Sequence, residues 1–331
     1  MINITTEFAG LKLKNPIIAG SSGLTSSVKS IKEIEKAGAA AIVLKSIFEE
    51  EITNEYDKIL SEANNDDSYR LEDLDYFDFK IKQDNLNNYI KLIKDAKDAV
   101  SIPIIASVNC VSSHEWTFFA SKIEQAGADA LELNVFLNPS DTSKTSEEKE
   151  QIYFDIIDKI TSTIKIPVIL KMSYYFTNLG KMIQKLSETN IKGLVLFNRF
   201  FSPDIDLNSN KIIPVNIFST ENELSTSLRW VAISSHNASC NIAASTGVHT
   251  GKGVIKQILA GADAVQVASI LYKKGVSEIK ELLKDIEGYM EEKGYSNISD
   301  FKGLMNYKNS QNPAQYERAQ FMKYFNENTT A

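Results

Sequence analysis

The amino-acid sequence predicts an α/β fold in which eight parallel strands close into a (β/α)8 barrel, or TIM barrel. First, four segments share one pattern, a Gly suited to a helix end followed by an apolar run: 37–45, 126–134, 190–198 and 260–268. Second, three segments enter an apolar run through a proline: 15–23, 100–109 and 164–173. Third, with a weaker run at 239–247, eight strands alternate with helix-period stretches, and this count favours a barrel over a doubly wound sheet.

The predicted elements follow one another along the chain. The strands are expected near 16–20, 41–45, 103–108, 130–134, 167–171, 193–197, 240–244 and 264–268. Their unbroken apolar character suits parallel strands that are buried on both faces. Helical spacing is clear where Val28, Ile31 and Ile34 share one face. Further helices are expected at 88–100, 115–127, 153–164, 253–262 and 277–295.

Two stretches interrupt the alternation of strands and helices. Residues 47–87, after the second strand, are acidic and polar and predict a long connection. Residues 199–229, after the sixth strand, alternate enough to hold a hairpin. Extended loops after strands 2 and 6 lie on the side where barrel enzymes place their active sites. We expect residues 1–325 to form a single domain and residues 326–331 a disordered tail.

Composition excludes several classes of protein. The apolar fraction of 43% supports a sizeable core, and the net charge of -7 argues against nucleic acid or an anionic membrane as the main partner. Two cysteines and three scattered histidines give no disulfide framework, iron–sulfur cluster or metal-ligand spacing. Because no apolar run reaches about 18 residues and no secretory pattern opens the chain, we expect a cytoplasmic protein.

Polar side chains end five predicted strands in a row. They are Lys45, Asn109, Asn134, Lys171 and Asn198, and Arg199 follows the last. A polar residue after one strand is unremarkable, but five at the same barrel end favour a shared cationic pocket over an apolar floor. Two buried lysines without acidic partners nearby would imply an anionic ligand.

Gly-rich turns after the seventh and eighth strands are candidates for a phosphate site. Residues 245–253 open a helix after strand 7, and residues 267–275 follow strand 8. Backbone N–H groups at a helix start bind phosphate, and barrels often bind it at these two loops. A Gly-rich turn is also explained by chain geometry alone, and no Walker A pattern is present.

Eight motifs in order resemble those of the dihydroorotate dehydrogenases: GLKLKNPIIAGSSG, VLKS, IPIIASVN, ADALELN, IPVILKMS, LVLFNR, TGVHTG and AGADAVQVAS. The sequence is most similar to the soluble class 1 branch, in particular a dihydroorotate dehydrogenase-like subgroup, over residues 5–285. The resemblance implies a barrel with FMN at its carboxyl face. It also implies hydride transfer between FMN and a small cyclic or anionic substrate, such as the dihydroorotate of pyrimidine biosynthesis.

The resemblance implies cofactor contacts from the ends of all eight strands. These are Ala19, Gly20, Ser21, Lys45, Ser46, Asn109, Asn134, Lys171, Asn198, Thr246, Gly247, Ala268 and Ser269. The last four would cradle the phosphate, and the others would contact the flavin ring. Lys45, Asn134 and Lys171 would also be catalytic, with Lys171 stabilising the negative charge of the reduced ring.

The residues expected to bind the substrate and accept its proton depart from the family pattern. The family reads Asn-x-x-Cys-Pro-Asn after strand 4, or Ser for Cys, and that Cys or Ser takes a proton from dihydroorotate. Leu137 occupies this position here and cannot accept a proton. Ser140 and Asp141 are candidate replacements, although they also form a good turn. Thr142 and Cys110 are further alternatives, the thiol being equally explained as an inert buried group.

The substrate contacts implied by the resemblance are fewer. Asn138 and Asn198 would bind substrate, and Arg199 could hold a carboxylate through two hydrogen bonds. Tyr174 and Tyr175, after strand 5, either face the site or only pack. We expect His249 to have a surface role rather than a catalytic one.

Two main functions stay open at this point. One is an FMN-dependent enzyme, and the other is a flavin- or phosphate-binding barrel without turnover that has lost the base. A third, a flavin enzyme reducing transfer-RNA uridines, is disfavoured by the net charge of -7. As partners we expect a small anionic substrate, a second copy in a homodimer and a separate electron-acceptor protein, with no nucleic acid, membrane or metal.

Overall fold

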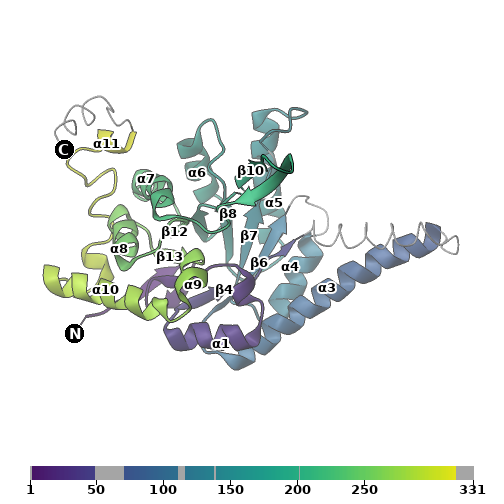
Figure 1. Cartoon of the computed structure of the whole chain (residues 1–331), viewed down its shortest axis with the longest axis horizontal. Coiled ribbons are helices and arrows are strands. Elements are labelled where there is room, and N and C mark those ends of the chain that lie inside the picture. Colours follow the sequence, from purple (N-terminus) through teal and green to yellow (C-terminus); the bar gives the residue numbers. More distant parts are fainter. Residues whose placement is uncertain (1, 49–70, 111–115, 138, 201, 318–331) are drawn as a thin grey trace.

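The computed structural model describes residues 2–48, 71–110, 116–137, 139–200 and 202–317. Within these ranges eight parallel strands pair into a closed ring, which confirms the (β/α)8 barrel (Figure 1). The ring consists of β3 (Ile17–Ala19), β4 (Ala41–Val43), β6 (Ile104–Cys110), β7 (Ala130–Val135), β8 (Val168–Met172), β9 (Gly193–Leu196), β12 (Asn241–Ser245) and β13 (Ala264–Val267). Each strand lies where the sequence predicts one. The short β5 (Ile47–Phe48) adds a parallel pairing to β6.

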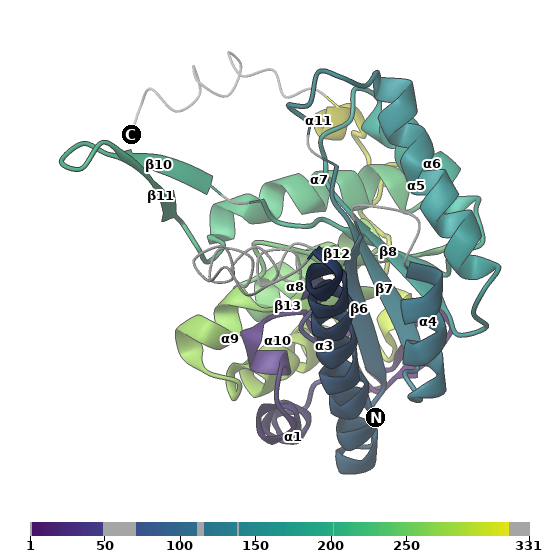
Figure 2. The ribbon, with the colours of Figure 1, turned by 90° about the vertical axis from the view of Figure 1, so that its right-hand side faces the viewer.

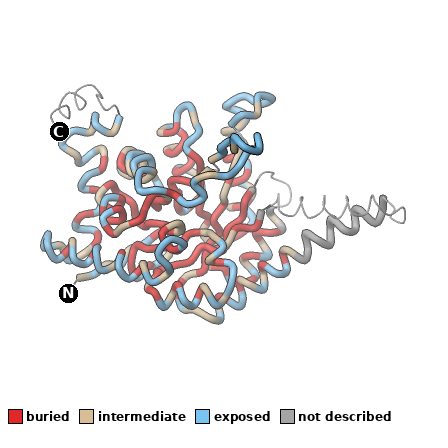
Figure 3. Tube along the Cα trace, viewed as in Figure 1, coloured by how far each residue is buried: buried red, intermediate tan, exposed pale blue. Residues whose placement is uncertain are grey.

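Helices surround this ring (Figure 1), and the buried residues of the described chain gather where the helices meet the strands (Figure 3). They are α1 (Val28–Ala37), α3 (Leu71–Ala99), α4 (Trp116–Gln125), α5 (Ser146–Thr161), α6 (Leu179–Ser187), α7 (Leu224–Ser234), α8 (Gly251–Ala260) and α10 (Glu278–Lys293). Gly38 and Gly261 end α1 and α8 in the left-handed region, at φ 111° and φ 113°. These two residues confirm the predicted pattern of a Gly between helix and strand.

The predicted connection over residues 47–87 is wrong in its second part. Helix α3 begins at Leu71 and already covers residues 71–87, whereas the sequence indicated a helix only from residue 88. This stretch contains good helix formers such as Leu, Glu and Lys, but its acidic and amide residues obscured an apolar period. Residues 49–70 lie outside the described residues.

An N-terminal hairpin closes the amino end of the barrel. Strands β1 (Thr6–Phe8) and β2 (Leu11–Leu13) pair in antiparallel fashion and were not predicted. Phe8 and Leu13 are buried against the inward-facing apolar residues of the ring, which form the apolar floor. The hairpin is tied to the last strands, because Thr6 Oγ1 donates to the Asp263 carbonyl oxygen at 2.9 Å. The Ala9 N–H donates to Asn241 Oδ1 at 2.9 Å.

The hairpin predicted after strand 6 is confirmed. Strands β10 (Ser202–Asp206) and β11 (Lys211–Val215) pair in antiparallel fashion and project away from the ring (Figure 2). Near the carboxyl end, α10 confirms the predicted closing helix, and α9 (Ser269–Lys274) and α11 (Ala314–Glu317) are short. The expected tail at 326–331 falls outside the described part of the chain. Within that part, no helix combines the length and apolarity needed to cross a membrane.

Candidate active site

A cavity of about 360 Å³ opens at the carboxyl ends of the ring strands, in the size range of small-molecule sites. Its walls come from Lys171 in β8, from the loops after β3, β9, β12 and β13, and from residues 217–219 before α7. Eight of the predicted cofactor residues line it: Gly20, Ser21, Lys171, Asn198, Thr246, Gly247, Ala268 and Ser269. Of the five predicted polar strand ends, Lys171 and Asn198 line this cavity, whereas Lys45, Asn109 and Asn134 are not among its lining residues.

A buried polar layer lies between this cavity and the apolar floor. Lys171 Nζ donates to Gln266 Oε1 at 3.0 Å, and Gln266 Nε2 donates to Glu132 Oε2. Lys171 Nζ also lies 3.7 Å from Glu132 Oε1. Lys171 therefore has an acidic partner, so the condition under which buried lysines would imply an anionic ligand is not met at this residue. Glu132 was overlooked, although a Glu inside the apolar run ALELN is a signal, since an unpaired buried carboxylate is costly.

Two buried amide oxygens point to a ligand. In the described part of the chain, Asn109 Oδ1 and Asn134 Oδ1 are buried and have no hydrogen-bond partner. Asn109 pairs in register with Asn134, and Asn134 with Lys171, so the three residues form a row across β6, β7 and β8. Because buried acceptors are nearly always satisfied, this row calls for a ligand that carries N–H or O–H donors.

A chain of hydroxyl groups supports the opposite wall. Ser21 Oγ lies 3.1 Å from Ser46 Oγ, which lies 2.7 Å from Ser107 Oγ. The Ser46 N–H donates to Ser21 Oγ at 3.0 Å. Tyr89, which the sequence did not single out, accepts from the Ser107 N–H at 2.8 Å. Ser46 is buried and holds Ser21, which lines the cavity, so its own predicted flavin contact stays a prediction.

The remaining predicted ring contacts are also placed by the structure. Ala19 is fully buried in β3 directly before Gly20. Lys45 is half-buried after β4, where it interacts with another residue. Neither residue lines the cavity itself, so their roles toward a cofactor remain predictions.

The predicted phosphate turn is strained. Thr246 has φ 76° and Gly247 has φ 79°, and the left-handed region is a genuine outlier for a β-branched residue. Thr246 Oγ1 donates to the Phe197 carbonyl oxygen at 3.2 Å, which helps to hold this conformation. Such strain is characteristic of ligand-binding turns.

The segment before α7 packs against the same turn. The Ser219 N–H donates to Ser269 Oγ at 3.0 Å, and Ser219 Oγ lies 2.9 Å from His249 Nε2. Lys273 Nζ donates to the Ser219 carbonyl oxygen at 2.7 Å. His249 is buried, so the expected surface role is wrong. It instead supports the loop that covers the phosphate side.

Acidification is expected to destabilise the protein through His249. Burial, and then the charge of Lys273, lower the pKa of this histidine below its usual 6.5. A histidine whose pKa is lower in the folded state than in the unfolded state favours folding at pH values above 6.5, where it is neutral in both states. This contribution to the free energy of unfolding is lost as the pH falls from 6.5 through the pKa of the folded state. Urea unfolding at pH 7.5 and pH 5.5 should therefore show a larger loss of stability in the wild type than in His249→Asn. His236→Asn is the control, and equal losses in wild type and His249→Asn would contradict the role.

Arg199 is engaged by the protein itself. Its Nε donates to Glu223 Oε2 at 2.8 Å, and its Nη1 donates to the Ile217 carbonyl oxygen at 2.9 Å. A further hydrogen bond goes from Nη2 to the Asn216 carbonyl oxygen. The predicted grip on a substrate carboxylate would have to compete with Glu223, and it stays a prediction.

The candidate bases lie to one side of the cavity. Asp141 lines a neighbouring hollow of about 540 Å³ together with Leu137. Hydrogen bonds from Ser143 keep the pKa of the Asp141 carboxyl below its usual value. Ser140 is exposed and makes a side-chain or backbone interaction. Asn138 and the side chain of Cys110 lie outside the described part of the chain, so these four assignments remain predictions.

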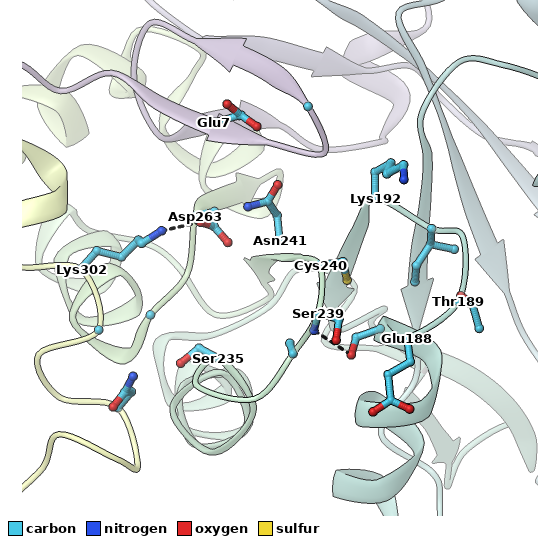
Figure 4. A pocket seen from close by; sticks show the side chains of 17 residues that line it. Glu7, Glu188, Thr189, Lys192, Ser235, Ser239, Cys240, Asn241, Asp263 and Lys302 are labelled. Carbon is cyan, nitrogen blue, oxygen red and sulfur yellow. Dashed lines mark hydrogen bonds and ion pairs between the residues drawn. The ribbon is translucent and has the colours of Figure 1, made fainter.

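The amino end of the barrel holds a different kind of hollow. It measures about 770 Å³ and is lined by the residues in Figure 4. Asp263 pairs there with Lys302 at 2.7 Å, and the Asp263 carboxylate also accepts from the Ile242 N–H. Burial raises the pKa of the Cys240 thiol to about 12, which makes it a poor nucleophile. Barrel chemistry takes place at the opposite face, so this hollow is not the active site.

The chain is similar to known proteins over most of its length. A family model described as "Dihydroorotate dehydrogenase" matches residues 3–290. The catalytic subunit of dihydroorotate dehydrogenase B (NAD(+)) from Thermoplasma volcanium is 27% identical over 315 residues, covering 92% of this chain and 99% of the relative. The proteins of the same name from Methanocaldococcus jannaschii and Petrotoga mobilis are each 24% identical. They align over 87% and 92% of this chain, and over 94% and 100% of their own lengths.

Proposed function

Because the chain belongs to the dihydroorotate dehydrogenase family and is an oxidoreductase of that type, we propose that it binds FMN and transfers hydride between FMN and a small cyclic substrate. The observation that carries this proposal is the row of unsatisfied amide oxygens of Asn109 and Asn134 beside Lys171, the member of the row that lines the cavity of about 360 Å³. We further propose that residues 1–325 form a single FMN-binding domain.

The residues present fit FMN. A flavin ring offers an N–H donor and carbonyl acceptors at its edge, and the side chains of Asn109, Asn134 and Lys171 have the complementary groups. The strained turn at Thr246 and Gly247, with Ala268 and Ser269 across the cavity, would hold the phosphate through backbone N–H groups. FMN would supply the hydride acceptor and donor chemistry that no protein side chain has.

The side chains of the protein would then bind and orient the cofactor and the substrate. Lys171 would place a positive charge at the cavity floor, where it favours the reduced, negatively charged form of the cofactor. Glu132 and Gln266 would hold this ammonium in position. Since Leu137 cannot accept a proton, any proton taken from substrate carbon would go to another group, for which Asp141 and Ser140 are the candidates.

The names of the relatives bear on the electron acceptor. Those proteins are named as catalytic subunits of NAD(+) enzymes. We propose that this chain likewise passes electrons to a separate acceptor protein. The rate at which the reduced protein is reoxidised tests this proposal. Reoxidation should be slow with NAD(+) alone and faster when an acceptor subunit of such an enzyme is added.

The visible spectrum of the purified protein tests the proposal. We expect a bound flavin, either as isolated or after FMN is added and excess is removed. Anaerobic addition of dihydroorotate and then dithionite separates the outcomes. Bleaching by dihydroorotate would mean that the family reaction is retained, and bleaching by dithionite alone would mean that another substrate is used. Failure to bind FMN would refute the proposed function.

A further inference from the structure

Five aromatic side chains gather beside the proposed flavin cavity. This aromatic cluster comprises Phe136, Tyr174, Tyr175, Phe197 and Phe200, from the loops after β7, β8 and β9. The ring centroid of Phe200 lies 5.0 Å from that of Phe136 and 4.8 Å from that of Tyr175. Tyr174 lies 4.7 Å from Tyr175 and 5.7 Å from Phe197. These separations are those of directly interacting rings.

The cluster is not a buried core. Phe197 is buried, but Tyr174 and Tyr175 are 39% and 49% exposed. Aromatic rings left this accessible at the mouth of a site gain from being covered by a ligand, because their apolar surface is then removed from water. The sequence left open whether the two tyrosines face the site, and the structure places both of them at its edge.

The cluster lines a hollow that continues into the flavin cavity. The hollow measures about 120 Å³ and is bounded by Tyr174, Tyr175, Phe197 and Phe200. An apolar cavity of about 150 Å³ in another protein holds one benzene ring, so a planar ring bound in this smaller hollow would extend into the adjoining flavin cavity. The hollow shares five lining residues with the flavin cavity: Phe197, Asn198, Arg199, Ser245 and Thr246. A ring bound there would therefore adjoin the cofactor.

The charges at this hollow are already balanced. Arg199 and Glu223 both line it, and they form an ion pair at 2.8 Å. Arg199 Nη1 also donates to the Ile217 carbonyl oxygen, and Nη2 donates to the Asn216 carbonyl oxygen and to Glu223 Oε1. A carboxylate entering the hollow would meet the negative charge of Glu223, and it would have to displace these hydrogen bonds to reach Arg199.

We infer that the aromatic cluster is the substrate subsite and that it takes a neutral, planar, conjugated ring rather than a carboxylate. This inference rests on the proposed function for the position of the cofactor and defines the substrate class of the same site. The rings of Tyr175 and Phe200 provide the stacking surface, and the Tyr174 hydroxyl provides a polar contact for ring substituents.

Binding of a matched pair of probes tests the inference. Orotate and its amide, orotamide, share one planar ring and differ in a single negative charge. We expect titration calorimetry on the FMN-loaded protein to show at least tenfold tighter binding of orotamide. Tighter or equal binding of orotate would overturn the inference, as would a failure of the amide to bind.

Two variants locate the binding to the cluster. Tyr175→Leu and Phe200→Leu keep apolar bulk but remove a ring, and each should weaken orotamide binding about 2- to 10-fold. Tyr307→Leu removes an aromatic residue that stacks on His236 away from the site and should leave binding unchanged. Unchanged binding in both cluster variants would overturn the inference.

The flavin content of each sample, read from its visible spectrum, separates this inference from the proposed function. If the wild type takes up no FMN, the proposed function fails, and the same titration on the FMN-free protein still compares the two probes. Tighter binding of orotamide to the FMN-free protein would support the aromatic cluster as a subsite for a neutral ring. Tighter binding of orotate would overturn this inference.

Discussion

Gly247→Ala is expected to abolish retention of FMN. A Cβ at this position would lie 2.1 Å from the Leu224 backbone nitrogen and 2.6 Å from the Glu223 carbonyl carbon. Both neighbours are backbone atoms at the start of α7, so the clash cannot be relieved by a side-chain rotation. The turn and α7 must move apart, which would displace the N–H groups proposed to bind phosphate. Absorbance of the protein after FMN loading and desalting measures the loss.

Gly10→Ala is a matched control for this substitution. Gly10 has φ 78° against 79° for Gly247, so each alanine carries a similar left-handed backbone cost of about 1–2 kcal/mol. Around Gly10, however, no atom lies within 4 Å of an added Cβ. Gly10→Ala should lose some stability and keep its flavin. Retention of flavin by Gly247→Ala would show that this turn does not hold the cofactor.

Lys171→Met is expected to lower both the reduction potential of the bound flavin and the stability of the protein. Removing the ammonium withdraws the positive charge that favours the reduced cofactor. It also leaves the fully buried Glu132 without its cation, a loss that typically costs about 3–5 kcal/mol. Redox titration against a dye of known potential measures the first effect, and urea unfolding measures the second.

The double variant Glu132→Gln with Lys171→Met separates the two effects. Neutralising Glu132 removes the unpaired charge, so most of the lost stability should return. The reduction potential should stay low, because the ammonium is still missing. Lys274→Ala, which breaks an exposed ion pair with Glu278, is the surface control and should change neither quantity appreciably. A potential that recovers in the double variant would mean that Lys171 acts only through folding.

The parts of the fold that the sequence predicted are those with strong local signals. Gly38 and Gly261 mark helix ends because left-handed φ values favour glycine, and the buried strands are read from unbroken apolar runs. The hairpin β1–β2 was missed because three-residue strands have too few positions for a period. Its packing depends on β12 and β13, more than 200 residues further along the chain.

The sequence predicted which loops and several of the residues that line the candidate site, but not how its charged side chains pair. The partnership of Lys171 with Glu132 depends on which residues of β7 and β8 face the barrel interior, and local pattern does not give it. The pairing of Arg199 with Glu223 joins residues 24 positions apart across the β10–β11 hairpin. In the sequence, Phe136 and Phe200 are indistinguishable from other apolar residues, and only the folded loops bring their rings into contact.

The N-terminal hairpin also limits the order in which parts of the barrel can fold during synthesis. Phe8 and Leu13 leave the ribosome more than 200 residues before Asn241 and Asp263, to which the hairpin is tied. Such long sequence separations slow folding, because chain closure must come before the contacts can form. The floor of the barrel can therefore be sealed only after β12 and the start of β13 have been synthesised. A nascent chain stalled before β13 should remain protease-sensitive at its amino end, well after its middle strands have emerged.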